Sequence, residues 1–205
     1  MLPDYLRRLV DFFNEVSISE CSVDEFSPEY EVRILDIDKQ GMIEKIISLN
    51  GAELVNNEML QRRYIFDYPN GTLRENSSWV RLRSVGREEI ELTLKKRGSG
   101  SDFEKTVLVS GFEETKVRLE AFGLVVTGYQ ENIRTTFKVG KIIFDLDTWP
   151  MINPYIEIEA PSKEMVLEGV LLLGFTEADA THLVGEALFR HYGIDLASIK
   201  ELSFD

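Results

Sequence analysis

Residues 29–34 read Glu-Tyr-Glu-Val-Arg-Ile, a strict alternation of polar and apolar residues that has the period of a half-buried β-strand. Successive side chains of a strand point to opposite faces, so Glu29, Glu31 and Arg33 share one face. Side chains two residues apart on a face are roughly 6–7 Å apart, and two carboxylates at that spacing can hold a divalent cation, directly or through its waters. The alternative is an ordinary antiparallel strand with a hydrated outer face.

Later stretches repeat this alternation, at residues 79–83, 89–95, 134–138, 141–147 and 155–159. In each, charged residues gather on one face and Val, Ile, Leu or Phe on the other. Acids and bases on the polar faces nearly balance. The acids are Glu29, Glu31, Glu91, Asp145, Asp147, Glu157 and Glu159, and the bases are Arg33, Arg81, Arg83, Lys95, Arg134, Lys138 and Lys141.

The apolar faces of these strands must be buried, and segments with helical periodicity are available to cover them. The sequence therefore predicts an α+β fold, with residues 1–28 as an N-terminal helix and linker and residues 29–205 as one domain. Helices are predicted at residues 5–16, 39–49, 113–122, 162–173 and 176–192, and further strands at 52–56, 61–68, 103–109 and 124–138.

Composition excludes several classes of partner. The chain has 205 residues, 43% of them hydrophobic, and a net charge of −13, so its surface should repel nucleic acid and anionic membranes. The single cysteine, Cys21, rules out an internal disulfide and indicates a reducing cytoplasm. No apolar run is long enough for a membrane span, and the first residues lack the basic segment of a signal peptide. A homodimer is left open.

The balanced charges on one face predict a particular class of ligand. If the sheet closes, these charges line an interior surface, where they must pair, stay hydrated or bind a ligand. Bases can bind a chain of phosphates, and paired acids can hold Mg²⁺ or Mn²⁺ beside it. An open sheet with a solvated charged face, whose ion pairs contribute little, is the alternative.

The ordered set of motifs resembles the CYTH domain family, also called triphosphate tunnel metalloenzymes. The residues that carry the resemblance begin with Glu29-x-Glu31-x-Arg33, which is similar to the family's ExExK signature. This family includes class IV adenylyl cyclases, thiamine triphosphatases and inorganic tripolyphosphatases. The resemblance covers about residues 29–192, in the family's order. It continues with Arg81-Leu82-Arg83, Glu91-Leu92-Thr93-Leu94-Lys95, Arg134, Asp145 and Glu157-Ile158-Glu159.

The resemblance implies a closed, antiparallel, eight-stranded β-barrel that encloses a hydrophilic tunnel, with helices packed outside. It also implies a divalent metal, Mg²⁺ or Mn²⁺, and a triphosphate-containing small molecule as the partner. The metal ligands implied are Glu29, Glu31, Asp145, Glu157 and Glu159; the triphosphate-binding residues are Arg33, Arg81, Arg83, Lys95 and Arg134, of which Arg33, Lys95 and Arg134 are the candidate catalytic residues.

The sequence departs from the family pattern at two places. Arg33 stands where the signature has lysine; arginine keeps the charge but is longer and forked. Because the family lysine can help to organise the attacking water, the exchange bears on hydrolysis. In the last predicted helix, residues 183–186 read Leu-Val-Gly-Glu where many members have a Ser-Tyr pair.

Three functions fit this pattern. The first is a metal-dependent phosphohydrolase acting on inorganic tripolyphosphate or on a nucleoside or thiamine triphosphate. The second is a class IV adenylyl cyclase, which forms cyclic AMP and pyrophosphate from ATP. The third is a non-catalytic polyphosphate-binding barrel. This alternative stays open because Arg33 stands in place of the signature lysine. We favour the hydrolase, because the sequence has no evident adenine pocket and a pure anion binder gains nothing from the acids.

Overall fold

The computed structural model describes residues 3–18, 30–86, 89–96 and 103–204, so most of the predicted linker, including Cys21, and also Glu29 lie outside the described residues. The chain divides into two compact units, each with its own core. The first unit comprises Met1–Glu25, Gln61–Gln130 and Lys200–Ser203, and the second comprises Phe26–Leu60, Glu131–Ile199 and Phe204–Asp205.

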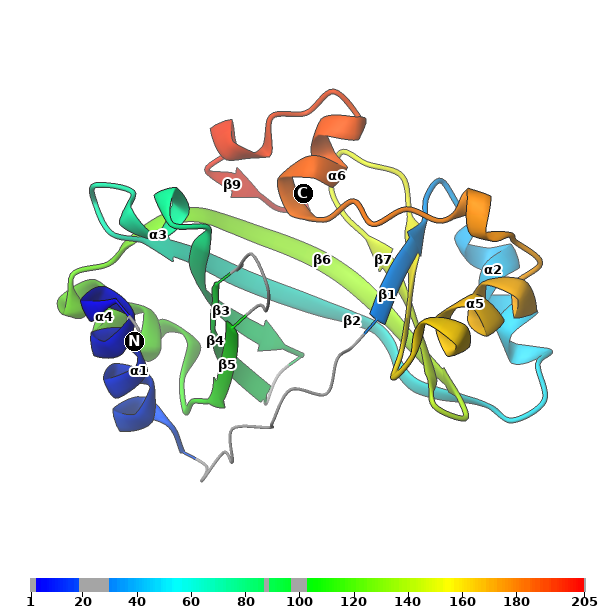
Figure 1. The fold of residues 1–205 in the computed structure, drawn as a ribbon, viewed down its shortest axis with the longest axis horizontal. Helices are drawn as coiled ribbons and strands as arrows, with labels where there is room; N and C mark the ends of the chain where they lie inside the picture. The colour runs from blue at the N-terminus through cyan, green and yellow to red at the C-terminus, as the bar shows by residue number, and fades with distance from the viewer. Residues whose placement is uncertain (1–2, 19–29, 87–88, 97–102, 205) are drawn as a thin grey trace. The chain divides into compact units, whose positions relative to one another are not determined.

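The described strands form a nine-stranded sheet in the order β1-β8-β7-β6-β2-β3-β4-β5, with β9 paired to β6 (Figure 1). Six pairs are antiparallel, namely β1–β8, β8–β7, β7–β6, β2–β3, β3–β4 and β4–β5, and β9 pairs with β6 in parallel. The predicted α+β class and the large antiparallel sheet are confirmed. The strand bounds are Tyr30–Ile34 (β1), Ala52–Asp67 (β2), Ser78–Val85 (β3), Glu89–Lys96 (β4), Phe103–Leu108 (β5), Val125–Val139 (β6), Ile142–Thr148 (β7), Tyr155–Ala160 (β8) and Glu201–Leu202 (β9).

The predicted barrel closure is not seen among the described strands, because the order ends at β1 on one side and at β5 on the other. The free edge of β1 is capped instead. Thr181 exchanges both backbone hydrogen bonds with Arg33, each at 2.8 Å. Pairing an edge strand in this way satisfies backbone groups that would otherwise be open to another chain.

In the second unit, α2 (Lys39–Ile47) and α5 (Lys163–Leu172) cover the apolar face of β1, β7 and β8 (Figure 1). Ile46, Phe144 and Ile158 are fully buried in this core. Gly169 lets α5 approach the sheet closely, because a Cβ there would lie 2.7 Å from Ile158 Cγ2. Since strand side chains alternate, the charged residues of these strands lie on the face that the two helices do not cover.

In the first unit, α1 (Asp4–Val16) and α4 (Phe112–Phe122) pack beside each other and against β3, β4 and β5, with the short α3 (Thr72–Glu75) nearby (Figure 1). The predicted helix at residues 5–16 is confirmed. Its apolar stripe is buried, and Phe12 of α1 contacts Phe122 of α4 with ring centroids 4.8 Å apart. The residues of α1 are therefore part of a shared core with β4 and β5.

Two predicted elements differ from those observed. The strands predicted at residues 52–56 and 61–68 are one continuous strand, β2, which passes through Glu58 at φ 47°. The helix predicted at residues 176–192 is divided: a 3₁₀ turn at Glu177–Asp179 is followed by extended chain, and α6 spans only Gly185–His191. The extended part is where Thr181 pairs with β1, and backbone bonded to another strand cannot continue a helix. A second 3₁₀ turn, η2, spans Leu196–Ser198.

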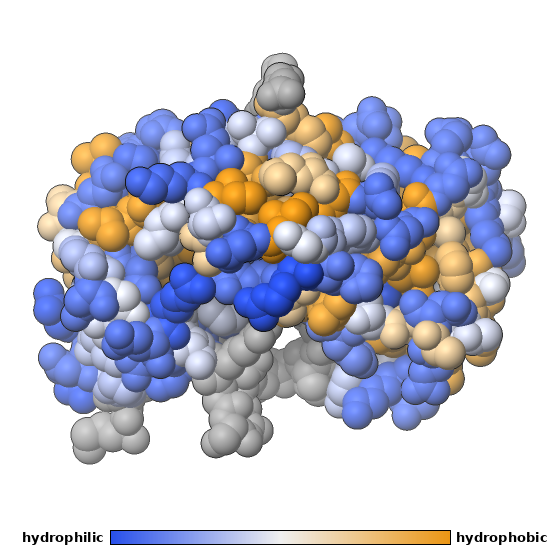
Figure 2. Space-filling model, turned by 90° about the horizontal axis from the view of Figure 1, so that it is seen from above, coloured by the Kyte–Doolittle hydropathy of each residue, from blue (hydrophilic) through white to orange (hydrophobic). Residues whose placement is uncertain are grey.

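The surface is mainly hydrophilic, with smaller hydrophobic areas between the polar residues on the face shown in Figure 2. This agrees with the net charge of −13. In the part of the chain that the structure describes, no helix combines the length and the apolar character needed to cross a membrane.

Candidate active site

The pairing registers of the second unit bring charged residues of β1, β8, β7 and β6 onto one face. Arg33 on β1 lies directly opposite Glu157 on β8, and Glu157 lies opposite Asp145 on β7. In the next row, Glu31 lies opposite Glu159. Directly opposite residues have their Cβ atoms about 4.5–5.5 Å apart on the same face. The register therefore gathers every predicted site residue of this unit except Glu29, which is not described.

Three of these residues form a carboxylate cluster, defined here as Glu31, Glu157 and Glu159. One carboxylate oxygen of each lies within 4.8 Å of the others. Glu157 is buried and Glu31 is open to solvent on one side. Burial raises the pKa of Glu157, and the positive charges of Arg134 and Arg33 offset part of this rise. Three carboxylates converging on one point are a donor set that suits Mg²⁺ or Mn²⁺, which prefer oxygen ligands.

The guanidinium of Arg33 reaches into the carboxylate cluster. Its Nη2 donates to Glu31 Oε1 at 3.2 Å and also to Glu157 Oε2. Its Nη1 is buried and has no hydrogen-bond partner among the residues that the structure describes. Burial acts to lower the pKa of Arg33, but the charges of Glu157 and Glu31 outweigh it and the pKa is raised. Arg33 is therefore a buried cation with one nitrogen free to bind an anion.

Arg134 on β6 is held by two aspartates of β7. Its Nε and Nη2 donate to the two oxygens of Asp147 at 2.9 and 2.5 Å, and its Nη1 donates to Asp145 Oδ2 at 2.5 Å. Glu157 Oε1 lies 3.6 Å from Nη2. Asp145, predicted as a metal ligand, lies outside the carboxylate cluster and also accepts a hydrogen bond from Thr136 at 2.6 Å. The structure thus places Asp145 as a partner of Arg134.

Asn132 is a site residue that the sequence did not identify. It is fully buried, and its Nδ2 donates to Asp147 Oδ1 at 2.7 Å, so it helps to hold the carboxylate that binds Arg134. The signal that could have found it is its spacing. It lies two residues before Arg134 on a strand, and hence on the same face.

The first unit carries a second charged face on β3 and β4. Arg83 donates to Glu91 Oε2 through Nε at 2.8 Å and Nη2 at 2.5 Å, and Lys95 forms an ion pair with Glu104 at 2.8 Å. Arg81, directly opposite Thr93, belongs to the same face. The predicted phosphate-binding residues Arg81, Arg83 and Lys95 therefore lie together within this unit.

Arg63 on β2 belongs to the same charged face as Arg83, and the sequence did not identify it as a site residue. It lies directly opposite Arg83 and is only 8% exposed. Two arginines in directly opposite positions repel each other unless acids or a bound anion lie nearby. Alternation along β2 could have shown it, because Tyr64 and Phe66 belong to the opposite, apolar face.

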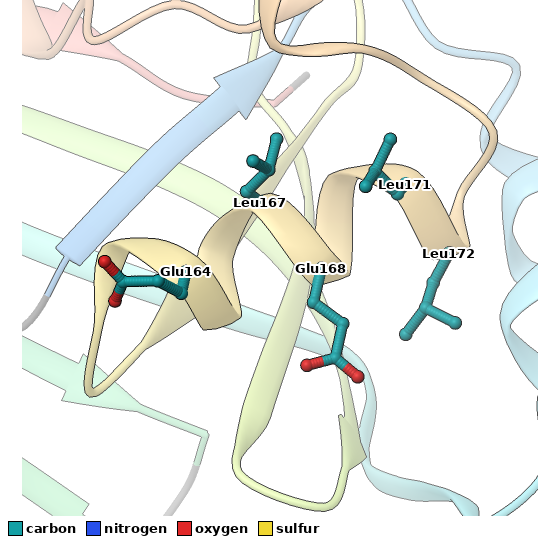
Figure 3. A pocket seen from close by; sticks show the side chains of 5 residues that line it. All are labelled: Glu164, Leu167, Glu168, Leu171 and Leu172. Atoms are coloured by element: carbon teal, nitrogen blue, oxygen red, sulfur yellow. The ribbon is translucent and has the colours of Figure 1, made fainter.

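A shallow hollow on α5 has a different character. Its lining residues come from one helix, where Leu167 and Leu171 lie together on one side (Figure 3). The helix packs on the apolar face of the sheet through Gly169, and the carboxylate cluster belongs to the other face. The hollow therefore does not contribute to the site.

Comparison with known proteins adds a family match. The family model described as the CYTH domain matches residues 27–175. No curated protein sequence matches the chain. Among solved structures, an adenylate cyclase candidate from Vibrio parahaemolyticus is similar, with a TM-score of 0.69, 17% identity, and coverage of 79% of this chain and 97% of that one.

Two further solved structures have the same fold. An adenylyl cyclase candidate from Hippeastrum, described as having a dominant triphosphatase activity, has a TM-score of 0.58 and 18% identity, and the match covers 83% of this chain and 98% of that one. A protein from Pyrococcus horikoshii has a TM-score of 0.61 and 20% identity, over 75% of this chain and 94% of that one. At these identities the likeness shows the fold alone.

Proposed function

Because the chain belongs to the CYTH domain family, we propose that it is a metal-dependent phosphohydrolase acting on a triphosphate-containing substrate: inorganic tripolyphosphate, a nucleoside triphosphate or thiamine triphosphate. The observation that carries the proposal is the carboxylate cluster with the Arg33 guanidinium beside it. Adjacent acids and bases are needed when one ligand is a polyanion and the other a divalent cation. A surface that bound only anions would have no use for three converging carboxylates.

Each group has a role in this proposal. Glu31, Glu157 and Glu159 would hold Mg²⁺ or Mn²⁺, which when bound neutralises charge on phosphate oxygens. Arg33 and Arg134 would bind phosphate oxygens and stabilise the charge that develops on the leaving phosphates. Both guanidiniums are oriented by buried carboxylates before substrate arrives. Such orientation lowers the cost of reorganisation during the reaction.

The remaining roles rest on the family resemblance. Triphosphate binding by Arg81, Arg83 and Lys95, a metal-binding role for Glu29 and Asp145, and a closed eight-stranded barrel belong to the proposal for this reason. Arg81, Arg83 and Lys95 supply positive charge on strands of the first unit.

Adenylyl cyclase activity is the second candidate, because several similar structures are described as adenylate cyclase candidates. Cyclisation and hydrolysis can share the same acids and bases, and they differ in which phosphorus atom is attacked. The Hippeastrum protein carries the cyclase name and yet has a dominant triphosphatase activity. This neighbour is one reason to place hydrolysis first.

A product assay separates these functions. The protein is incubated with tripolyphosphate, ATP and thiamine triphosphate in turn, with Mg²⁺ or Mn²⁺, and phosphate, pyrophosphate and cyclic AMP are measured. Release of phosphate supports the hydrolase, whereas cyclic AMP with pyrophosphate supports the cyclase. Binding of tripolyphosphate without any product supports a binding module and would overturn the enzyme proposal.

Paired variants test whether any turnover arises at the proposed site. Glu159→Gln removes one charge from the carboxylate cluster and should reduce turnover by at least about a hundredfold, the scale on which removing one electrostatic catalytic group acts. Glu168→Gln is the matched control, because Glu168 is an exposed residue of α5 outside the site. Equal turnover in the two variants at saturating metal would refute the assignment.

A further inference from the structure

Arg33 is bonded to two of the three carboxylates that would bind the cation. Its Nη2 contacts Glu31 and Glu157, and both are members of the carboxylate cluster. The backbone of Arg33 is anchored on two sides, by the β8 register and by both hydrogen bonds with Thr181. The guanidinium is thus a built-in positive charge held at the edge of the cluster.

A divalent cation in the cluster would draw on two of the carboxylates that Arg33 already contacts, Glu31 and Glu157. A guanidinium and a divalent cation that share the same two carboxylates repel each other, because both are positively charged and lie close together in a partly buried site. We infer that Arg33 competes with the divalent cation for Glu31 and Glu157, so that cation binding displaces the guanidinium. This inference rests on the metal site of the proposed function, and it concerns how that site is regulated.

Displacement of the guanidinium would make binding of the cation and binding of the triphosphate favour each other. One buried nitrogen of Arg33, Nη1, has no acceptor within the described part of the chain, and displacement from the carboxylates would take away the acceptors of Nη2 as well. A phosphate oxygen of the substrate supplies an acceptor for both, because guanidinium and phosphate form paired hydrogen bonds. A triphosphate should therefore raise the affinity for the cation, and by linkage the cation should raise the affinity for the triphosphate equally. In the absence of substrate, Arg33 keeps cation binding weak.

The test measures Mn²⁺ binding to the full chain by calorimetric titration, with no phosphate compound present. Arg33→Gln removes the competing charge and should bind Mn²⁺ about 5- to 150-fold more tightly than the wild type, the usual range of coupling between sites. The matched control is Arg118→Gln, which removes one positive charge from the surface pair of Arg118 with Glu15 in the first unit. This control should bind Mn²⁺ as the wild type does.

The outcomes distinguish the inference from the function on which it rests. Equal or weaker Mn²⁺ binding by Arg33→Gln would overturn the inference alone. Failure of both proteins to bind Mn²⁺, or unchanged binding after Glu159→Gln, would overturn the metal site and the inference together. Tighter binding by Arg118→Gln as well would show a nonspecific charge effect and would also overturn the inference.

A second measurement is made on the wild-type protein. In the wild type, Mg²⁺ is titrated while the Nε–H signal of the Arg33 side chain is followed by NMR, with Arg33→Lys used only to assign the signal. Displacement from Glu31 and Glu157 should shift this signal with the same midpoint as Mg²⁺ binding. An Arg33 signal that stays unmoved at saturating Mg²⁺ would overturn the inference.

Discussion

Replacing Asp147 by asparagine tests how far the site depends on its buried charges. Asp147 is fully buried and accepts three hydrogen bonds, two from Arg134 and one from Asn132. Asp147→Asn keeps the shape of the side chain but removes the charge and turns one oxygen into a donor facing Arg134. Breaking a buried ion pair by removing one partner costs about 3–5 kcal/mol. Asp145 still neutralises part of Arg134, so we expect a loss of about 3 kcal/mol in the free energy of unfolding.

The assay should report on the second unit. The chain has two tryptophans, Trp79 in the first unit and Trp149 in the second. In a Trp79→Phe background, Trp149 fluorescence follows unfolding of the second unit in urea. The loss of about 3 kcal/mol is obtained from the midpoint and slope of this urea transition.

The control is an ion pair on the surface. Glu120→Gln removes the partner of Lys116, an exposed i,i+4 pair at 2.8 Å, and should cost less than about 1 kcal/mol. Because this pair lies in the first unit, its effect is read by circular dichroism of the whole chain. If Asp147→Asn also costs less than about 1 kcal/mol, the reasoning that burial makes the Arg134 pair costly to break is refuted.

Three further predictions concern packing, pH and anion binding. Gly169→Ala places a Cβ 2.7 Å from Ile158 Cγ2 and should lower the free energy of unfolding by about 1–3 kcal/mol in urea denaturation; unchanged stability would contradict the close contact. Burial and the hydrogen bond to Asp36 raise the pKa of Tyr192 to about 12, so the phenol stays protonated to a higher pH in the folded state than in the unfolded state. The protonated phenol therefore stabilises the folded state below about pH 10, and this contribution should be lost as pH rises from about 10 through 12. The difference between the ultraviolet titration curves of the wild type and of Tyr192→Phe should show the raised pKa of Tyr192, and Asp36→Asn should lower this pKa. A Tyr192 pKa of about 10 in the wild type would contradict the prediction. Arg33→Ala should weaken tripolyphosphate binding about tenfold to a hundredfold, the cost of one charge-assisted contact, and calorimetric titration showing wild-type affinity would exclude Arg33 as a phosphate ligand.

Local alternation was enough to predict which residues share a face. Glu31 and Arg33 lie two residues apart, as do Glu157 and Glu159, and the structure places all four on one face of the second unit. The period of a strand is a property of the backbone and does not depend on distant residues. For the same reason the apolar stripe of α1 and most strand positions could be read directly from the chain.

Pairing between distant segments was decided only by the tertiary structure. Alternation does not say which residues lie opposite each other, and a slip of two residues would keep every face and change every partner. The register sets Arg33 against Glu157, which is 124 positions away in the chain. It also directs Asp145 to Arg134 and leaves it outside the carboxylate cluster.

Tertiary contacts also overrode two local signals. The pattern at residues 176–192 favours a continuous helix, but Thr181 pairs with the backbone of Arg33 and is held extended. The sequence predicted two strands that are separated between residues 56 and 61, yet β2 continues through this gap, and the Glu58 N–H donates to Thr135 Oγ1 at 3.2 Å. Sequence by itself thus determined the faces and the charge balance of the strands, because these follow from local alternation, and the family, because its motifs occur in order along the chain. The partners of each charge depend on long-range backbone pairing, which only the folded chain specifies.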